Sequence, residues 1–289
     1  MSQLYNLNIR EFDLSQIKMK IGHTPRILVY GPSGSGKSSL IIDLLYHNQD
    51  VPIVTVVSPT ERFNHTFKDI VPDIFLHDFN KEVIKKYTQR QENIQEKYAE
   101  DPEYKNVDPR SILILDDCLH KIKNIRNDPE MDFLFIAGRH VSACPIFAIQ
   151  DPIGLSPTQR GQLSYAFIFY EDKHTNLKKL YEHYCGIFPD QKTFNEVLDY
   201  VTQDYGCLVI DYTNKKTRNL EDKIFWYRAK LRSNFKMCDD MFWNIKPIDS
   251  ISESKLTDDG RNHYLNIRRI RSYSNEEEEY NPNIKPIRR

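Results

Sequence analysis

The sequence has 289 residues, which is enough for one large domain or for one domain with appendages. Hydrophobic residues make up 39% of the chain and aromatic residues 12%, so the chain can fill a sizeable core. Lysine and arginine number 40 against 41 acidic residues, and the net charge of −1 neither supports nor excludes a nucleic-acid partner, because such binding depends on local patches.

The first predicted strand covers residues 26–30, and a helix is expected from Lys37 to about His47. Between them lies GPSGSGKS, which fits the strand–GxxxxGK[ST]–helix phosphate loop. Such a loop surrounds a phosphate with backbone N–H groups, reaches the β- and γ-phosphates with Lys37 and binds Mg²⁺ through the Ser38 hydroxyl. Glycine and serine also suit any tight turn, but the strand before the stretch and the helix after it favour nucleotide binding. The nucleotide-binding residues are expected to be Gly31, Pro32, Ser33, Gly34, Ser35, Gly36, Lys37, Ser38 and Ser39.

Apolar runs alternate with helical patterns along the chain, which predicts an α/β fold of the P-loop NTPase class, a mainly parallel sheet with helices on both faces. Further strands are expected at Val51–Val57, Ser111–Leu115, Pro145–Ile149, Tyr165–Tyr170 and Cys207–Asp211. Asp128 and Pro129 suit the start of a helix that ends near Gly138. Two more helices are expected at about 175–184 and 190–203.

Two segments depart from this pattern. Residues 81–106 are almost all polar and are expected to form a solvated helix or helical hairpin inserted on the outside. Residues 249–289 are rich in serine, aspartate, arginine and glutamate and are expected to be flexible. The predicted organisation is therefore an N-terminal extension (1–21), an ATPase domain (22–248) and a charged tail (249–289).

Two strands are predicted to end in polar side chains that suit phosphate chemistry. The run ILILDD ends in Asp116, at the place where the Mg²⁺-side carboxylate of a P-loop NTPase lies, and in Asp117, which can orient and deprotonate a water. The alternative is an acidic turn after a strand. A later strand, expected beside the one that ends in Asp116, ends in Gln150, whose amide can donate to a phosphate and accept from the water.

The cysteines and the N-terminal sequence indicate the cellular compartment in which the protein is expected. Five cysteines without a CxxC pair indicate neither a disulfide framework nor a zinc ribbon, so a reducing compartment is expected. The stretch MSQLYNLNIREFDLSQ has no apolar core of a signal peptide, and no run approaches the ~18 residues of a membrane span. We expect a soluble, intracellular protein.

In their order along residues 22–232, these motifs resemble the FtsK–HerA superfamily of ring-forming ATPases, and within it the poxvirus-type genome-packaging ATPases of large nucleocytoplasmic DNA viruses. One departure is that HerA-type members have glutamate where this chain has Asp117. The resemblance rests on GPSGSGKS, ILILDDC, the GRH-to-Gln segment, DPIGLSPTQRGQLSYAFIF, KKLYEHYCGIFPDQKTFNEVLDYVT, CLVIDYT and FWYRA.

The resemblance implies an RecA/FtsK-like motor that uses ATP and Mg²⁺ to pump double-stranded DNA into a preformed capsid, working as a homo-oligomeric ring. Capsid or inner-membrane-associated virion proteins would be its partners, at a viral assembly site in the host cytoplasm or in the virion. Its DNA contacts are expected at two local clusters of cations, Lys215-Lys216-Arg218 and Arg228-Lys230-Arg232, and at the arginines of the tail.

The loop, the acids and the glutamine surround only one side of the γ-phosphate, so a neighbouring subunit is expected to supply a cation. Arg139, just after a helix and before the strand that ends in Gln150, is the first candidate, and FtsK-like proteins have a similar glycine–arginine pair. Arg160 is the second candidate, and a surface salt bridge is the alternative reading.

The sequence excludes some other P-loop functions and leaves two open. An ABC subunit would show an LSGGQ-like signature and a GTPase an NKxD-like base reader, and neither stands in the sequence. A small-molecule P-loop kinase and a nucleotide-switched scaffold both stay as alternatives. Trp226 and Tyr227 are expected to pack at a sheet edge, and Cys118 and Cys144 to fill core space.

Overall fold

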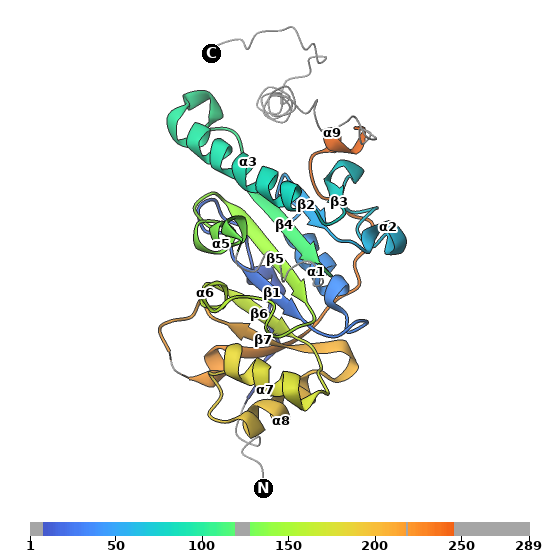
Figure 1. The fold of residues 1–289 in the computed structure, drawn as a ribbon, viewed down its shortest axis with the longest axis vertical. Coiled ribbons are helices and arrows are strands. Elements are labelled where there is room, and N and C mark those ends of the chain that lie inside the picture. Colours follow the sequence, from blue (N-terminus) through green and yellow to red (C-terminus); the bar gives the residue numbers. More distant parts are fainter. Residues whose placement is uncertain (1–7, 119–127, 218, 246–289) are drawn as a thin grey trace.

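The structure is a computed structural model, and it describes residues 8–118, 128–217 and 219–245. The predicted tail, residues 249–289, lies outside the described residues. Figure 1 shows one twisted sheet with helices packed along it. No helix in the described ranges is long and apolar enough to span a membrane.

The sheet has eight strands in the order β3-β2-β4-β5-β1-β6-β7-β8. Neighbouring strands from β3 to β6 are parallel, whereas β7 runs antiparallel to both β6 and β8. The predicted mainly parallel α/β fold is therefore confirmed. The strands are β1 (Ile27–Tyr30), β2 (Val54–Val57), β3 (Leu76–His77), β4 (Ser111–Asp116), β5 (Ala143–Ile149), β6 (Tyr165–Ile168), β7 (Gly206–Asp211) and β8 (Ile224–Arg228).

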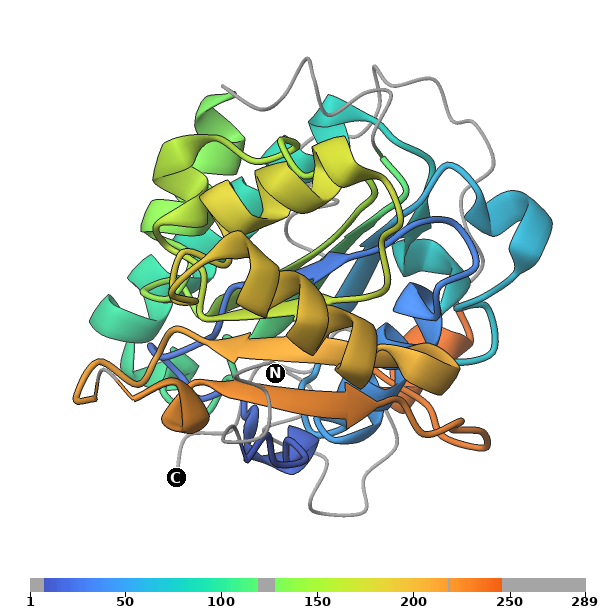
Figure 2. The ribbon, with the colours of Figure 1, turned by 90° about the horizontal axis from the view of Figure 1, so that it is seen from below.

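Helices cover both faces of the sheet, as predicted. Alternate residues of each strand face opposite layers: in β1, Leu28 and Tyr30 pack under α3, α5, α7 and α8, while Ile27 and Val29 pack against α1. Figure 2 shows α7 and α8 on one side of the sheet and α1 on the other. The helices are α1 (Lys37–Tyr46), α2 (Glu61–Asn64), α3 (Lys81–Glu100), α5 (Pro129–Ile136), α6 (Pro157–Arg160), α7 (His174–His183), α8 (Gln191–Val201) and α9 (Asp240–Trp243).

In the polar segment 81–106, Lys81–Glu100 form the single long helix α3 and Pro102–Tyr104 a short 3-10 turn after it, so the segment is a helix rather than a helical hairpin. One face of it is buried, because Ile84, Tyr87, Gln91 and Ile94 recur at helical spacing. Gln91 is fully buried, and its amide donates to the carbonyls of Pro109 and Val141, both at 2.9 Å. The segment is therefore solvated on one side only.

The chain from residue 12 to residue 19 packs into the same core as α1. Phe12 and Leu14 are buried, and the Phe12 N–H donates to the carbonyl of Trp226 at 2.8 Å. Trp226 lies in β8, at the edge of the sheet, in agreement with its predicted place.

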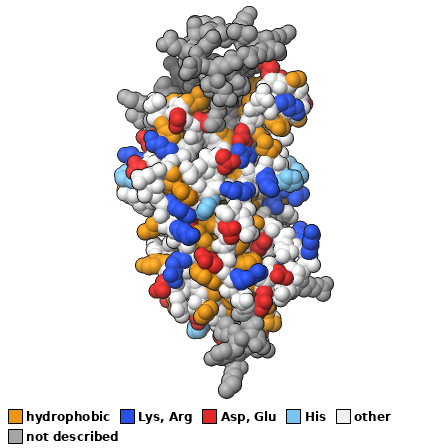
Figure 3. All heavy atoms as spheres, turned by 180° about the vertical axis from the view of Figure 1, so that it is seen from behind, with side chains coloured by type: hydrophobic (Ala, Val, Ile, Leu, Met, Phe, Trp, Pro, Cys, Tyr) orange, Lys and Arg blue, Asp and Glu red, His pale blue; other side chains and the backbone are white. Residues whose placement is uncertain are grey.

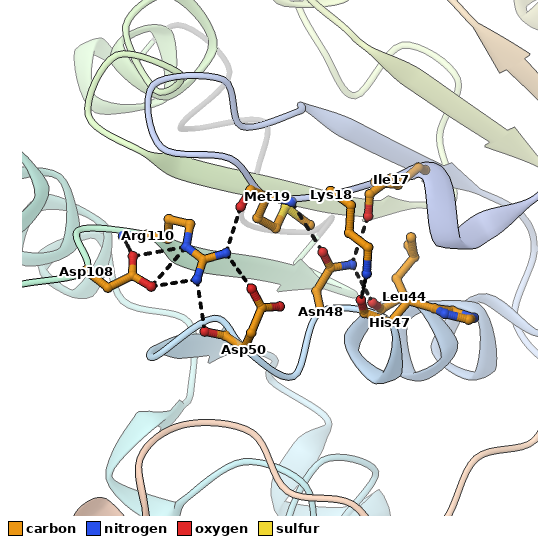
Figure 4. A network of polar contacts seen from close by, with 9 residues as sticks. All are labelled: Ile17, Lys18, Met19, Leu44, His47, Asn48, Asp50, Asp108 and Arg110. Atoms are coloured by element: carbon orange, nitrogen blue, oxygen red, sulfur yellow. Dashed lines mark hydrogen bonds and ion pairs between the residues drawn. The ribbon is translucent and has the colours of Figure 1, made fainter. Parts of the chain in front are cut away.

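The buried Asn48 and the partly buried Arg110 attach this N-terminal segment to the rest of the domain (Figure 4). Asn48 donates to the Ile17 carbonyl at 3.0 Å and accepts from the Met19 N–H at 3.3 Å. Arg110, which precedes β4, donates to the Met19 carbonyl at 2.9 Å and pairs with Asp50 at 2.6 Å. These contacts join the segment to the end of α1 and the start of β4.

Replacing Asn48 with alanine should lower the free energy of unfolding by about 1–3 kcal/mol, because it leaves buried backbone groups of Ile17, Met19 and Leu44 without partners. Urea denaturation measures the change. Gln49→Ala is the matched control: this amide is exposed, and its loss should cost about 0.5 kcal/mol or less. Equal losses from both variants would contradict the role given to Asn48.

Candidate nucleotide site

The strand order brings the predicted site residues together at the carboxyl ends of the central parallel strands, which form one edge of the sheet. β5 lies between β4 and β1, and all three are parallel. Tyr30 is level with Ile149, and Asp116 with Ala148, so the residues that follow these strands share one edge. The phosphate loop after β1, the acids at the end of β4 and Gln150 after β5 therefore lie side by side.

The phosphate loop depends on its glycines. Gly34 has φ +76° and Gly36 has φ +105°, conformations that side chains with a Cβ rarely adopt. Gly31 is needed for space, since a Cβ there would lie 2.9 Å from the Cβ of Phe169. Phe169, directly after β6, is buried and lies against Gly31 and Gly36 of the loop.

Two buried polar groups in the loop fit a phosphate. Lys37 is 7% exposed, and its ammonium donates to the carbonyls of Gly31 and Pro32, both at 2.7 Å. Burial lowers the pKa of Lys37, while Asp116 and Asp117 act against that shift. The Ser35 hydroxyl is buried without a hydrogen-bond partner. A bound phosphate would accept from the Lys37 ammonium, and the first turn of α1 would add its positive end.

The two acids differ in environment. Asp116 is 7% exposed, and burial first, then the charge of Asp117, raises its pKa to about 6. Asp117 has φ +51°, so the chain turns sharply there, and its side chain accepts a hydrogen bond from the Gln150 amide. The structure thus brings Asp117 and Gln150 into direct contact. Cys118 is buried and donates weakly to the carbonyls of Val57 and Asp116, which suits its expected packing role.

A third acid at this edge was not predicted. Glu61 opens α2 just after β2, is 7% exposed and accepts from the Phe67 N–H at 2.8 Å. Burial raises the pKa of Glu61, and its charge in turn contributes to the raised pKa of Asp116. The sequence carries a signal for Glu61, because an acid that closely follows an apolar strand, like Asp116, can lie at this end of the sheet.

The predicted arginines lie away from this edge. Arg139 is exposed in the turn before β5, at the amino end of a strand parallel to β1, and its Nε donates to His140 at 3.2 Å. Arg160, at the end of α6, donates to the Leu155 carbonyl at 2.6 Å and lies over the Tyr184 ring. Neither arginine joins the acids and the phosphate loop of its own chain.

Replacing Asp116 with asparagine should stabilise the folded protein at pH 7 when no nucleotide is present. The folded state holds this proton up to a pKa of about 6, whereas the ordinary value is 3.8. Between pH 3.8 and about pH 6 the folded state binds more protons at Asp116 than the unfolded state does. The stability that Asp116 contributes therefore falls as pH rises and is lost above the folded pKa. The gain from the variant should reach on the order of 3 kcal/mol at pH 7 and shrink towards pH 4.

Urea denaturation at both pH values tests this expectation. Asp211→Asn is the control. Asp211 ends the antiparallel strand β7, so it lies beside the amino end of β6, away from the site, and it is partly exposed. An equal effect of Asp116→Asn at both pH values would show that burial does not raise its pKa.

The chain is similar in sequence to proteins of large DNA viruses. No family model matches the sequence. The chain is 36% identical over 231 residues to the uncharacterized protein L437 of Acanthamoeba polyphaga mimivirus, covering 79% of this chain and 80% of that protein. It is 33% identical over 237 residues to the uncharacterized protein 075L of Invertebrate iridescent virus 6, covering 79% and 88%.

Among solved structures, the genome packaging NTPase B204 from Sulfolobus turreted icosahedral virus 2, in complex with AMPPCP, is similar in fold. The TM-score is 0.51 at 18% identity, covering 71% of this chain and 98% of that one. At 18% identity, this similarity shows a shared fold and nothing further. The chain therefore belongs to the family of viral proteins that includes L437 and 075L, and it has the mainly parallel α/β fold of a P-loop ATPase.

Proposed function

We propose that this protein is an ATP-driven double-stranded DNA translocase that packages a viral genome into a preformed capsid, working as a ring of identical subunits. The observation that carries the proposal is the meeting of the phosphate loop, Asp116, Asp117 and Gln150 at one edge of the sheet. The likeness in fold to a viral genome packaging NTPase supports the choice of substrate.

The residues at the edge suit ATP hydrolysis. Lys37 and the loop N–H groups would bind the β- and γ-phosphates, and Ser38 with Asp116 would hold Mg²⁺. The cation supplies positive charge to the phosphate oxygens when bound. Asp117 takes the proton of the attacking water, whose oxygen forms the new bond to the γ-phosphorus as ADP leaves. Gln150, hydrogen-bonded to Asp117, orients that water.

DNA contacts would come from local clusters of cations. Lys215 and Lys216, after β7, and Lys230, after β8, are exposed. Arg228 in β8 is exposed too, and its guanidinium lies 3.4 Å from the Asp204 carboxylate. Arg232 was expected to join them, but its Nε donates to the buried Asp43 at 2.8 Å, so this arginine is held within the domain. On the face in Figure 3, lysine and arginine side chains are interspersed with acidic and hydrophobic ones. Arg218 and the arginines of the tail lie outside the described residues.

Steady-state phosphate release, with and without double-stranded DNA, tests the proposal. We expect release to rise when duplex DNA of any sequence is added, and Lys37→Ala to abolish it. DNA affinity should fall with salt, with a log–log slope of about −0.9 for each phosphate neutralised. Tight ATP binding without release, even with DNA, would contradict a motor and favour a nucleotide-switched scaffold.

A further inference from the structure

Tyr205 is an exposed aromatic residue beside the phosphate loop. It immediately precedes β7, and 69% of its surface is exposed. A Cβ placed on Gly36 would lie 4.0 Å from its Cδ1. The ring therefore lies next to the glycine that opens α1.

The sheet explains why residues so distant in sequence meet. In β6, Ile168 is level with Tyr30 of β1 and with Leu208 of β7. Because β7 is antiparallel to β6, its first residues lie at the edge where β1 ends. Tyr205 thus lies on the β6–β7 side of the phosphate loop.

The residues that would act on the terminal phosphate lie on the opposite side of the loop. Asp116, Asp117 and Gln150 follow β4 and β5, and the terminal phosphate must lie near them for hydrolysis. The rest of a nucleoside triphosphate then extends away from β5, across the start of α1 and towards β6 and β7. Tyr205 is on that path.

The backbone at Tyr205 is also unusual. Asp204 and Tyr205 have φ of +50° and +63°, and two successive residues other than glycine in this region are uncommon. Arg228 lies against the turn, its guanidinium 3.4 Å from the Asp204 carboxylate and 3.5 Å from the Gln203 carbonyl. Strained conformations of this kind gather at binding sites, where the surrounding structure holds them in place.

We propose that the Tyr205 ring is a platform on which the base of the bound nucleoside triphosphate stacks. The inference rests on the proposed nucleotide site and adds a residue outside its phosphate loop and acids. An exposed ring offers a π-face, and base stacking on aromatic side chains tolerates different bases. Tyr205 would therefore strengthen binding of any purine nucleotide and contribute nothing to binding of its phosphates.

Two ligands separate these effects: ATP and inorganic tripolyphosphate, titrated calorimetrically into the full chain with Mg²⁺. Tyr205→Ala should weaken ATP binding about 5- to 150-fold, the range found for loss of one base–aromatic stack, and leave tripolyphosphate binding unchanged. Tyr205→Phe should bind ATP like the parent, because it keeps the ring. Tyr205→Gly accepts the positive φ without strain and should repeat the alanine result.

Tyr200→Ala is the matched control, since Tyr200 on α8 is 67% exposed and should leave both affinities unchanged. If Tyr205→Ala and Tyr205→Gly both keep the ATP affinity, or weaken both ligands equally, the platform is overturned. Lys37→Ala separates that failure from failure of the nucleotide site. It should weaken both ligands, and unchanged binding of both would overturn the site itself.

Discussion

Replacing Asp117 with asparagine should leave ATP bound and slow its hydrolysis about 10²- to 10⁴-fold, the range for loss of a general base. Asparagine keeps the shape of the side chain and can still accept a hydrogen bond from Gln150, which donates to Asp117 in the parent. Only the capacity to take the proton from water is lost. Single-turnover hydrolysis and calorimetric ATP binding, measured on the same preparation, separate chemistry from affinity.

Asp211→Asn makes the same chemical change at the other edge of the sheet and should hydrolyse ATP like the parent. Parental turnover by Asp117→Asn would show that another group activates the water. Glu61, the buried third acid at this end of the strands, would then be the next residue to test.

The second large effect is expected at Arg139. Within one chain this exposed arginine lies at the amino end of β5, whereas the phosphate loop lies at the carboxyl end of the neighbouring parallel strand β1, so we expect it to reach a neighbour's nucleotide rather than its own. An arginine that stabilises the charge on a transferring phosphoryl group contributes about 10³–10⁵ in rate. Arg139→Ala should therefore lose that factor in the assembled ring. Arg160→Ala should lose little, because Arg160 is bonded to the Leu155 carbonyl of its own chain.

Complementation distinguishes action across a subunit boundary from a structural role. Lys37→Ala and Arg139→Ala should each be inactive alone. In a mixed ring, a Lys37→Ala subunit offers its arginine to the intact phosphate loop of an Arg139→Ala neighbour, and phosphate release should partly return. If the subunits co-assemble and the mixture stays inactive, Arg139 does not act in trans.

The sequence predicted the parts of the site that depend on local pattern. The phosphate loop requires glycines at fixed spacing, and the acids and Gln150 follow apolar strands, so each is visible in a short stretch. The predicted neighbourhood of the strands ending in Asp116 and Gln150 is confirmed by their pairing. Trp226 and Tyr227 lie in the edge strand β8, as expected from their aromatic run.

The parts that sequence reasoning missed depend on contacts between distant segments. Tyr205 reaches Gly36 only because β7 reverses direction beside β6. Arg232 looked like a free surface cation, yet it pairs with Asp43, a buried carboxylate almost two hundred positions earlier. The two-residue strand β3 is too short to show a period in the sequence.

Translocation itself is tested by displacement of a labelled third strand annealed to one end of a linear DNA duplex. The parent protein should displace that strand when ATP and Mg²⁺ are present, and Asp117→Asn, which is expected to bind ATP, should not. A parent protein that hydrolyses ATP in the presence of duplex DNA but leaves the third strand in place would contradict the proposal that this chain is a DNA translocase.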